Sequence, residues 1–199
     1  MEIEFRSFGR VWASKVTTMY YANIKYYDIA NGVGIRTSLF VSGCRRHCKN
    51  CFNRETWSFS FGQHFTRAVE EEIYRSMDSD YVDGLTVLGG EPMEPENQRE
   101  LLPFFERFND RFPEKTIWLY SGYTWEEMTN GSARCEVTDS LLRQIDLLVD
   151  GPFVQEQYDV SLRFRGSANQ RILDVPASLA AGYPVMWEDD RVYSARYNK

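Results

Sequence analysis

The feature of the sequence that most restricts the fold is an alternation of strand-like and helix-like segments between residues 35 and 151. Strand-like runs, rich in β-branched, aromatic and other apolar residues, lie at 35–43, 85–88, 116–120 and 146–151. Helix-like patterns lie at 66–77, 96–112, 124–131 and 138–144. This alternation predicts βαβ units with right-handed crossovers, and therefore a mostly parallel sheet in a single α/β domain. Functional loops should follow the carboxyl ends of its strands.

Local signals support several of these helices. Thr66 can cap a helix that runs to Met77, and the segment 124–127 has the form of a capping box. Pro103 lies inside the pattern at 96–112 and predicts a kink or a late start there.

The two ends of the chain carry weaker patterns. Residues 1–18 read as an N-terminal extension with room for one short strand. Residues 176–199 read as a C-terminal tail, in which two β-type runs at 185–187 and 192–194 suit a small hairpin. The turn between those runs lacks an Asn-Gly type signal, so the sequence only permits the hairpin.

Composition and charge narrow the class of protein. A formal net charge of −6 gives no electrostatic reason to expect nucleic acid or a membrane surface as a partner. No stretch reaches the roughly 18 consecutive apolar residues that span a bilayer, and the acidic start has no apolar signal-peptide core. We therefore expect a cytoplasmic protein. Its four cysteines make a poor disulfide framework and favour a metal or redox site.

Three of those cysteines, Cys44, Cys48 and Cys51, lie in "SGCRRHCKNCFN", directly after the first predicted strand. Thiolates suit zinc, copper(I) and iron–sulfur clusters. Structural zinc usually needs a fourth ligand from a second pair, and only His47, His64 and Cys135 remain as candidates. A zinc loop stays open as an alternative. A cube of four irons held by three cysteines would leave one iron free to bind a small molecule. Cys135 alone reads as a small buried apolar residue.

The CxxxCxxC pattern, followed by "GGEP" at Gly89–Pro92, resembles the signature of radical S-adenosylmethionine enzymes. The stretches "YYDIANGVGIRTSLFVSGC", "CFNRETW", "SGY", "VDG" and "RGSANQR" follow the same order as in the activating proteins of anaerobic (class III) ribonucleotide reductases. That resemblance covers residues 20–171. It implies that residues 19–175 form a partial (β/α) barrel of the radical S-adenosylmethionine type, with the cluster loop after the first barrel strand.

The resemblance also implies a reaction. An electron from a flavodoxin-like or other low-potential donor passes through a 4Fe-4S cluster and cleaves S-adenosylmethionine to methionine and a 5′-deoxyadenosyl radical. The radical takes a hydrogen atom from a glycine of the partner, the anaerobic ribonucleoside-triphosphate reductase, and leaves a glycyl radical there.

Residue roles follow from matching positions. Three irons would be held by Cys44, Cys48 and Cys51, and the fourth would bind S-adenosylmethionine. Further cofactor contacts would come from Gly89, Gly90, Glu91, Ser121 and Asp150. The mouth that faces the partner's glycine would be formed by Asp28, Asn31, Gly32, Gly34 and Arg36. The motif at 165–171 receives no role. Relatives often have a lysine where this chain has Pro152, so that contact is absent or supplied elsewhere.

The sequence is also compatible with other functions. One alternative within radical chemistry is that the chain activates another glycyl-radical enzyme or acts on a small molecule. From a different class come a non-catalytic iron–sulfur electron carrier and a zinc-stabilised interaction module. Four basic residues near the cysteines read equally well as a solvated loop or as a docking patch for a donor or the reductase: Arg45, Arg46, Lys49 and Arg54.

Overall fold

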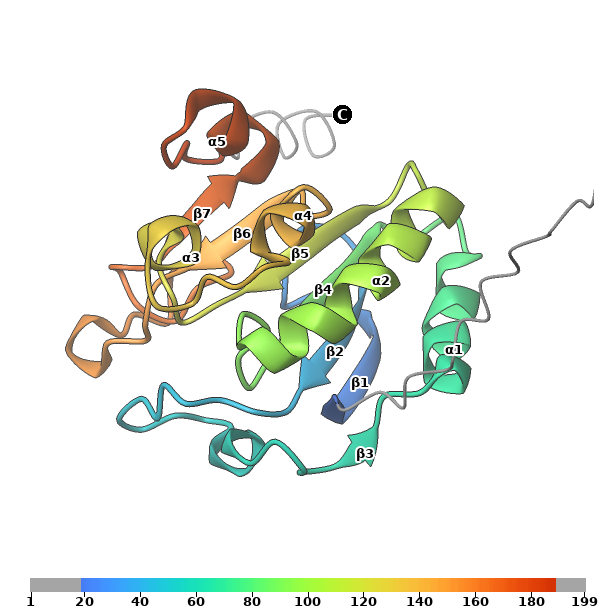
Figure 1. The fold of residues 1–199 in the computed structure, drawn as a ribbon, viewed down its shortest axis with the longest axis horizontal. Coiled ribbons are helices and arrows are strands. Elements are labelled where there is room, and N and C mark those ends of the chain that lie inside the picture. The colour runs from blue at the N-terminus through green and yellow to red at the C-terminus, as the bar shows by residue number, and fades with distance from the viewer. Residues whose placement is uncertain (1–18, 189–199) are drawn as a thin grey trace, which may run out of the picture.

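The computed structural model describes residues 19–188 (Figure 1). The predicted extension at 1–18 and the second run of the predicted hairpin, at 192–194, lie outside these residues. The strands are β1 (Tyr20–Asp28), β2 (Arg36–Val41), β3 (Gln63–His64), β4 (Gly84–Gly89), β5 (Thr116–Tyr120), β6 (Leu147–Asp150) and β7 (Arg171–Asp174). The α-helices are α1 (Arg67–Met77), α2 (Pro95–Arg111), α3 (Trp125–Asn130), α4 (Thr138–Leu142) and α5 (Val175–Ala181).

The strands form one seven-stranded sheet in the order β3-β1-β2-β4-β5-β6-β7. The four central strands β2, β4, β5 and β6 are parallel, whereas β1, β3 and β7 join the two edges in antiparallel pairs. The predicted α/β class with a mostly parallel sheet is therefore confirmed. Because the central strands run the same way, the loops that follow them meet at one edge of the sheet.

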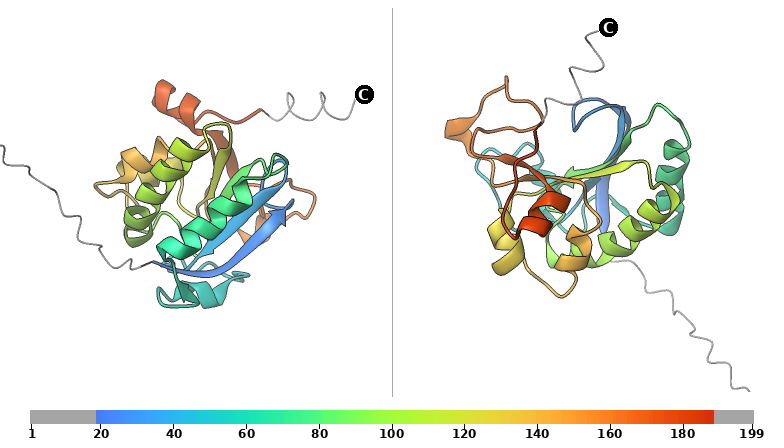
Figure 2. Two further views of the ribbon diagram at one scale, coloured as in Figure 1. Left: turned by 90° about the vertical axis from the view of Figure 1, so that its right-hand side faces the viewer. Right: turned by 90° about the horizontal axis from the view of Figure 1, so that it is seen from above.

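One face of the sheet packs against the helices, and Figure 2 shows α1, α2 and α4 on the same side of it. Alternate strand residues such as Leu39, Val87 and Leu119 are fully buried there with helix residues such as Phe104 and Phe108. The opposite face carries a smaller apolar cluster around Trp118, Val149 and Ile172. Of the helices in residues 19–188, none combines the length and the apolar character that crossing a membrane requires.

The predicted helix signals have the expected partners. The Thr66 hydroxyl accepts a hydrogen bond from the Val69 N–H at the start of α1. The capping box of α3 is complete, because the Thr124 hydroxyl and the Glu127 carboxylate each accept the other's backbone N–H. Pro103 neither delays nor stops α2, which continues through it to Arg111.

The two ends of the sheet differ from the sequence expectation. Strand β1 spans nine residues that the sequence pattern did not identify as a strand, and β7 and α5 begin at positions that also gave no signal. Helix α5 takes the first part of the predicted tail. Met186, from the first run of the predicted hairpin, forms an antiparallel bridge with Leu173 of β7. That run therefore adds to the sheet edge.

Candidate functional site

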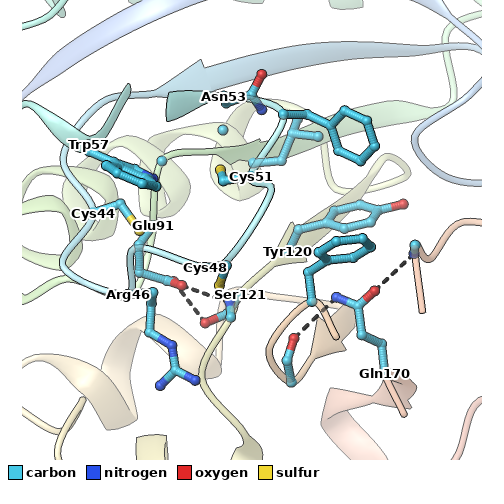
Figure 3. A pocket seen from close by; sticks show the side chains of 18 residues that line it. Cys44, Arg46, Cys48, Cys51, Asn53, Trp57, Glu91, Tyr120, Ser121 and Gln170 are labelled. Atoms are coloured by element: carbon cyan, nitrogen blue, oxygen red, sulfur yellow. Dashed lines mark hydrogen bonds between the residues drawn. The ribbon is translucent and has the colours of Figure 1, made fainter. Parts of the chain in front are cut away.

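The three cysteines share a pocket with the segments that follow β4 and β5. The pocket has a volume of about 260 Å³ and lies at the carboxyl ends of the parallel strands. Figure 3 shows Cys44, Cys48 and Cys51 around it, together with Glu91 and Ser121. Of the cofactor-binding residues predicted from the sequence, the structure thus brings all but one to the lining: Cys44, Cys48, Cys51, Gly89, Gly90, Glu91 and Ser121.

Backbone hydrogen bonds join the cysteine loop directly to the glycine-rich segment. The Gly90 N–H donates to the Val41 carbonyl at 2.7 Å, and the Glu91 N–H donates to the Gly43 carbonyl at 2.8 Å. A Cβ atom on Gly90 would lie 2.7 Å from the Gly43 oxygen, closer than a side chain is tolerated. Glycine is therefore required here so that the two backbones can approach.

Glu91 is the most constrained acid of the site. Its carboxylate is 1% exposed and accepts hydrogen bonds from the Met93 N–H (2.9 Å), the Ser121 hydroxyl (2.7 Å) and the Gly122 N–H (2.7 Å). Burial raises the pKa of Glu91 to about 7, against the three hydrogen bonds, which lower it. A cation placed beside this carboxylate would favour its charged form.

Ser121 supports Glu91. Its hydroxyl donates to the Glu91 carboxylate and accepts the Tyr123 N–H at 3.0 Å. The predicted contact of Ser121 with a cofactor stays a prediction, because both hydrogen bonds shown for this hydroxyl are to protein groups.

Asp150 does not line the pocket. It is fully buried, and its carboxylate accepts the Trp125 N–H at 2.7 Å and the Arg171 Nε–H at 2.9 Å. Arg171 also pairs with Glu126, and both carboxylates raise the pKa of the Arg171 guanidinium. Asp150 therefore fastens the start of α3 to β7, and the structure does not support a direct cofactor contact for it.

The five residues predicted to face the partner lie at the other end of β2, because the loop between β1 and β2 precedes that strand and the cysteines follow it. Arg36 is 1% exposed. Its five N–H groups donate to Val33, Leu85, Thr86 and Thr116. A side chain this deeply buried does not face a partner, so the structure does not support that expectation for Arg36.

The rest of this loop forms a tight turn. The Asp28 carboxylate accepts the Ala30 N–H and the Asn31 side-chain amide, and Gly32 and Gly34 have φ values of +126° and +79°. The hydrogen bonds help to lower the pKa of Asp28 although burial opposes this. A role for this turn at the partner interface stays a prediction.

Three of the four basic residues near the cysteines pair with carboxylates of the same chain. Arg45 pairs with Glu94 and Glu96, Arg46 with Glu127 at 3.2 Å, and Lys49 with Glu156 at 3.5 Å. The Arg54 guanidinium lies 5.7 Å from the centre of the Trp57 ring. This arrangement favours a loop fastened to its own domain over a free basic patch.

The sequence analysis gave no role in the pocket to several residues that line it, among them Trp57, Tyr120, Phe153 and Gln170. Gln170 explains part of the motif at 165–171. Its side-chain oxygen accepts the Gly166 N–H at 2.8 Å, and its side-chain N–H donates to the Gly151 carbonyl at 3.1 Å. The motif thus holds one wall of the pocket to the end of β6. The sequence pointed to Gln170 only through this motif, to which it assigned no role.

The cysteine donors fit an iron–sulfur cluster. All four cysteines are free thiols, and burial raises the pKa of Cys44 to about 11, so its thiolate needs a neighbouring metal charge. Within residues 19–188, no three His, Cys, Asp or Glu side chains gather closely enough to hold a single metal ion. Cys44, Cys48 and Cys51 all line one pocket, and cysteine thiolates are the ligands that iron–sulfur clusters use. Cys135 lies elsewhere, 3.4 Å from the Gln98 side-chain oxygen.

Comparison with known proteins agrees with this geometry. A family described as the 4Fe-4S single cluster domain matches residues 30–173. Three relatives share the name anaerobic ribonucleoside-triphosphate reductase-activating protein. The one from Haemophilus influenzae is 42% identical over 153 residues, which cover 75% of this chain and 95% of that protein. The one from Escherichia coli K12 is 40% identical over 150 residues, covering 73% and 94%.

The third relative comes from Enterobacteria phage T4 and is 36% identical over 154 residues, covering 77% of this chain and 93% of that protein. These matches span nearly the whole length of each relative. The family match at residues 30–173 includes the cysteine loop. The chain therefore belongs to the 4Fe-4S single cluster domain family and, within it, to the anaerobic ribonucleoside-triphosphate reductase-activating proteins.

Proposed function

We propose that this chain activates an anaerobic ribonucleoside-triphosphate reductase by radical S-adenosylmethionine chemistry, within a partial (β/α) barrel of that type. The names of the relatives support the partner, since they say this of those proteins. One observation carries the chemistry: the thiols of Cys44, Cys48 and Cys51 share a pocket with the segment Gly89–Glu91. An electron carrier needs only the thiols, whereas the adjoining glycine segment gives a small molecule a place beside them.

Each part of the pocket then has a role. The three cysteines would hold three irons of a 4Fe-4S cluster. When bound, the cluster would supply the one electron that splits S-adenosylmethionine into methionine and a 5′-deoxyadenosyl radical, which takes a hydrogen atom from a glycine of the reductase and leaves a glycyl radical and 5′-deoxyadenosine. The electron would come from a flavodoxin-like or other low-potential donor.

The chain's own residues would bind and orient the methionine part. Two carboxylate oxygens offer about four acceptor positions, and the contacts of Glu91 within the protein use three. One position remains for an ammonium group, whose positive charge would hold Glu91 ionised. Gly89 and Gly90 carry no side chain, so that a ligand can reach the backbone next to them.

Anaerobic reconstitution tests the proposal. The purified chain is loaded with iron and sulfide, reduced with dithionite and given S-adenosylmethionine, with and without the anaerobic reductase. We expect 5′-deoxyadenosine by chromatography and, with the reductase, a glycyl radical doublet in the electron paramagnetic resonance spectrum. A fully loaded chain that forms no 5′-deoxyadenosine would refute the chemistry. Product without a doublet on the reductase would refute the partner.

Cysteine variants provide the matched comparison. Changing Cys44, Cys48 or Cys51 to alanine removes a proposed iron ligand, so each variant should lose cleavage altogether. Cys135→Ala is the control, because this thiol contacts Gln98 and Thr138 outside the pocket. It should keep cleavage near the level of the unchanged chain. Equal losses in all four variants would show that the ligand assignment is mistaken.

A further inference from the structure

Two buried polar side chains at the start of α2 lie beside the pocket without lining it. Glu94 precedes the first residue of the helix, and Asn97 lies in its first turn. Each is 1% exposed. Buried polar groups of this kind need hydrogen-bond partners, so the position of those partners shows what the two side chains do.

Asn97 bridges the two motifs of the site. Its side-chain amide has two N–H groups, and it donates to the Ser42 carbonyl at 3.0 Å and to the Glu91 carbonyl at 2.9 Å. Ser42 lies two residues before Cys44. One side chain therefore ties the start of the cysteine loop to the end of the glycine-rich segment.

Glu94 contacts Arg45, the residue that follows Cys44. Its carboxylate accepts the Arg45 backbone N–H at 2.7 Å and also the Arg45 guanidinium. The Glu94 N–H donates to the Glu91 carbonyl at 3.2 Å. The residues at 42 and 45, which flank Gly43 and Cys44, are thus both fixed by the first turn of α2.

We propose that Glu94 and Asn97 are positioning residues that set the first cysteine ligand against the segment that binds the methionine part. The inference rests on the proposed function, because it takes Cys44 as an iron ligand and Gly89–Glu91 as the methionine contact. Among the described residues, no side chain other than that of Asn97 is shown to hydrogen-bond to both the cysteine loop and the glycine-rich segment. We call the hydrogen bonds of Glu94 and Asn97 to the residues on either side of Cys44 the clamp. Displacements near 1 Å in a site of this kind have large effects on binding and rate, so losing the clamp should impair ligand binding as well as stability.

The first test compares Asn97→Ala with Asn109→Ala. Asn109 is the matched control, because it lies on the same helix and donates its amide to the Gln144 carbonyl at 3.0 Å, far along the helix from the cysteines. After reconstitution, Asn97→Ala should hold less iron per chain. Its loaded fraction should bind S-adenosylmethionine about tenfold or more weakly than Asn109→Ala, with a smaller change in the spectrum of the reduced cluster when the ligand is added.

Two substitutions test Glu94: one removes only its charge, and the other removes its hydrogen-bond acceptor. Glu94→Gln keeps an oxygen that can accept the Arg45 N–H, so it should retain iron and ligand affinity within about threefold of the unchanged chain. Glu94→Ala removes the acceptor and should behave like Asn97→Ala. If Asn97→Ala does not fold, Asn97→Ser retains one donor and should bind S-adenosylmethionine at an intermediate strength; the thermal unfolding temperature of each cluster-free variant separates folding from positioning.

The outcomes distinguish the two proposals. If the unchanged chain holds its irons but forms no 5′-deoxyadenosine, the proposed function fails. If the unchanged chain forms the product while Asn97→Ala and Glu94→Ala bind iron and S-adenosylmethionine within a factor of two of Asn109→Ala, the clamp fails and the proposed function stands.

Discussion

Replacing Asp150 by asparagine separates a structural role from a cofactor contact. The substitution keeps the size of the side chain and removes its charge. In the structure Asp150 is fully buried and accepts one backbone N–H from Trp125 and two N–H groups from Arg171. Breaking a buried ion pair by removing one partner costs about 3–5 kcal/mol. The Arg171 side chain is 30% exposed and keeps Glu126, so we expect a cost at or just below the lower limit of that range, about 2–3 kcal/mol.

This loss is large enough to measure. For a chain of this size, 1 kcal/mol corresponds to roughly 2–4 °C in the unfolding temperature, so Asp150→Asn should lower it by about 4–12 °C. Circular dichroism of the cluster-free chain measures that temperature. Glu126→Gln is the control, because Glu126 is 58% exposed and its pair with Arg171 should contribute at most about 1 kcal/mol.

The affinity for S-adenosylmethionine decides between the two roles. At a temperature where both chains are folded, the loaded Asp150→Asn variant should bind the ligand about as well as the unchanged chain. An unchanged unfolding temperature together with weak ligand binding would refute the structural reading. It would restore Asp150 as the cofactor contact that the sequence predicts.

Three further predictions follow from the same contacts. Burial raises the pKa of Glu91 from 4.5 to about 7, so the folded chain keeps a proton that the unfolded chain has released, and this group makes stability fall as pH rises between those values. Denaturant unfolding of the cluster-free chain at pH 4.5 and 7.5 should show a loss of roughly 3 kcal/mol that Glu91→Gln lacks. Arg36→Lys replaces five N–H donors by three and should cost about 2–4 kcal/mol in the same assay, while the affinity for the reductase stays unchanged; weaker reductase binding at full stability would contradict the buried role. Gly90→Ala forces a Cβ against the Gly43 oxygen and should lower stability by about 1–3 kcal/mol and the iron content after reconstitution, and normal iron content would contradict the need for close approach.

The sequence predicts best those elements whose signals are local. Thr66 and the Thr124–Glu127 pair lie within three residues of the N–H groups that they cap, so the starts of α1 and α3 can be predicted from short segments. The buried central strands are also visible, because both of their faces are covered and they are rich in β-branched, aromatic and other apolar residues. The cysteine loop and the glycine segment follow such strands, and the parallel order then predicts that they meet.

Elements at the sheet edges depend on partners that a sequence pattern does not reveal. Strand β1 contains many exposed residues and shifts its register against β2, which obscures the alternation expected of a strand. Strand β7 has four residues and gains its place by pairing with β6. Arg36 and Asp150 show the same limit: Arg36 donates to Thr116, 80 residues away, and Asp150 accepts from Arg171, 21 residues away.

The register of the buried strands sets the height at which the site begins. Val41 of β2 pairs with Gly89 of β4, and Val87 of β4 pairs with Leu119 of β5. Continuing that register places Ser121 level with Gly89, so the cysteine loop, the glycine segment and the serine start at one level. Because a slip by one residue would exchange the side chains of the helix-covered face with those of the opposite face, the packing of the core fixes this level. Core substitutions that loosen β4 against its neighbours should therefore impair iron loading before they unfold the chain.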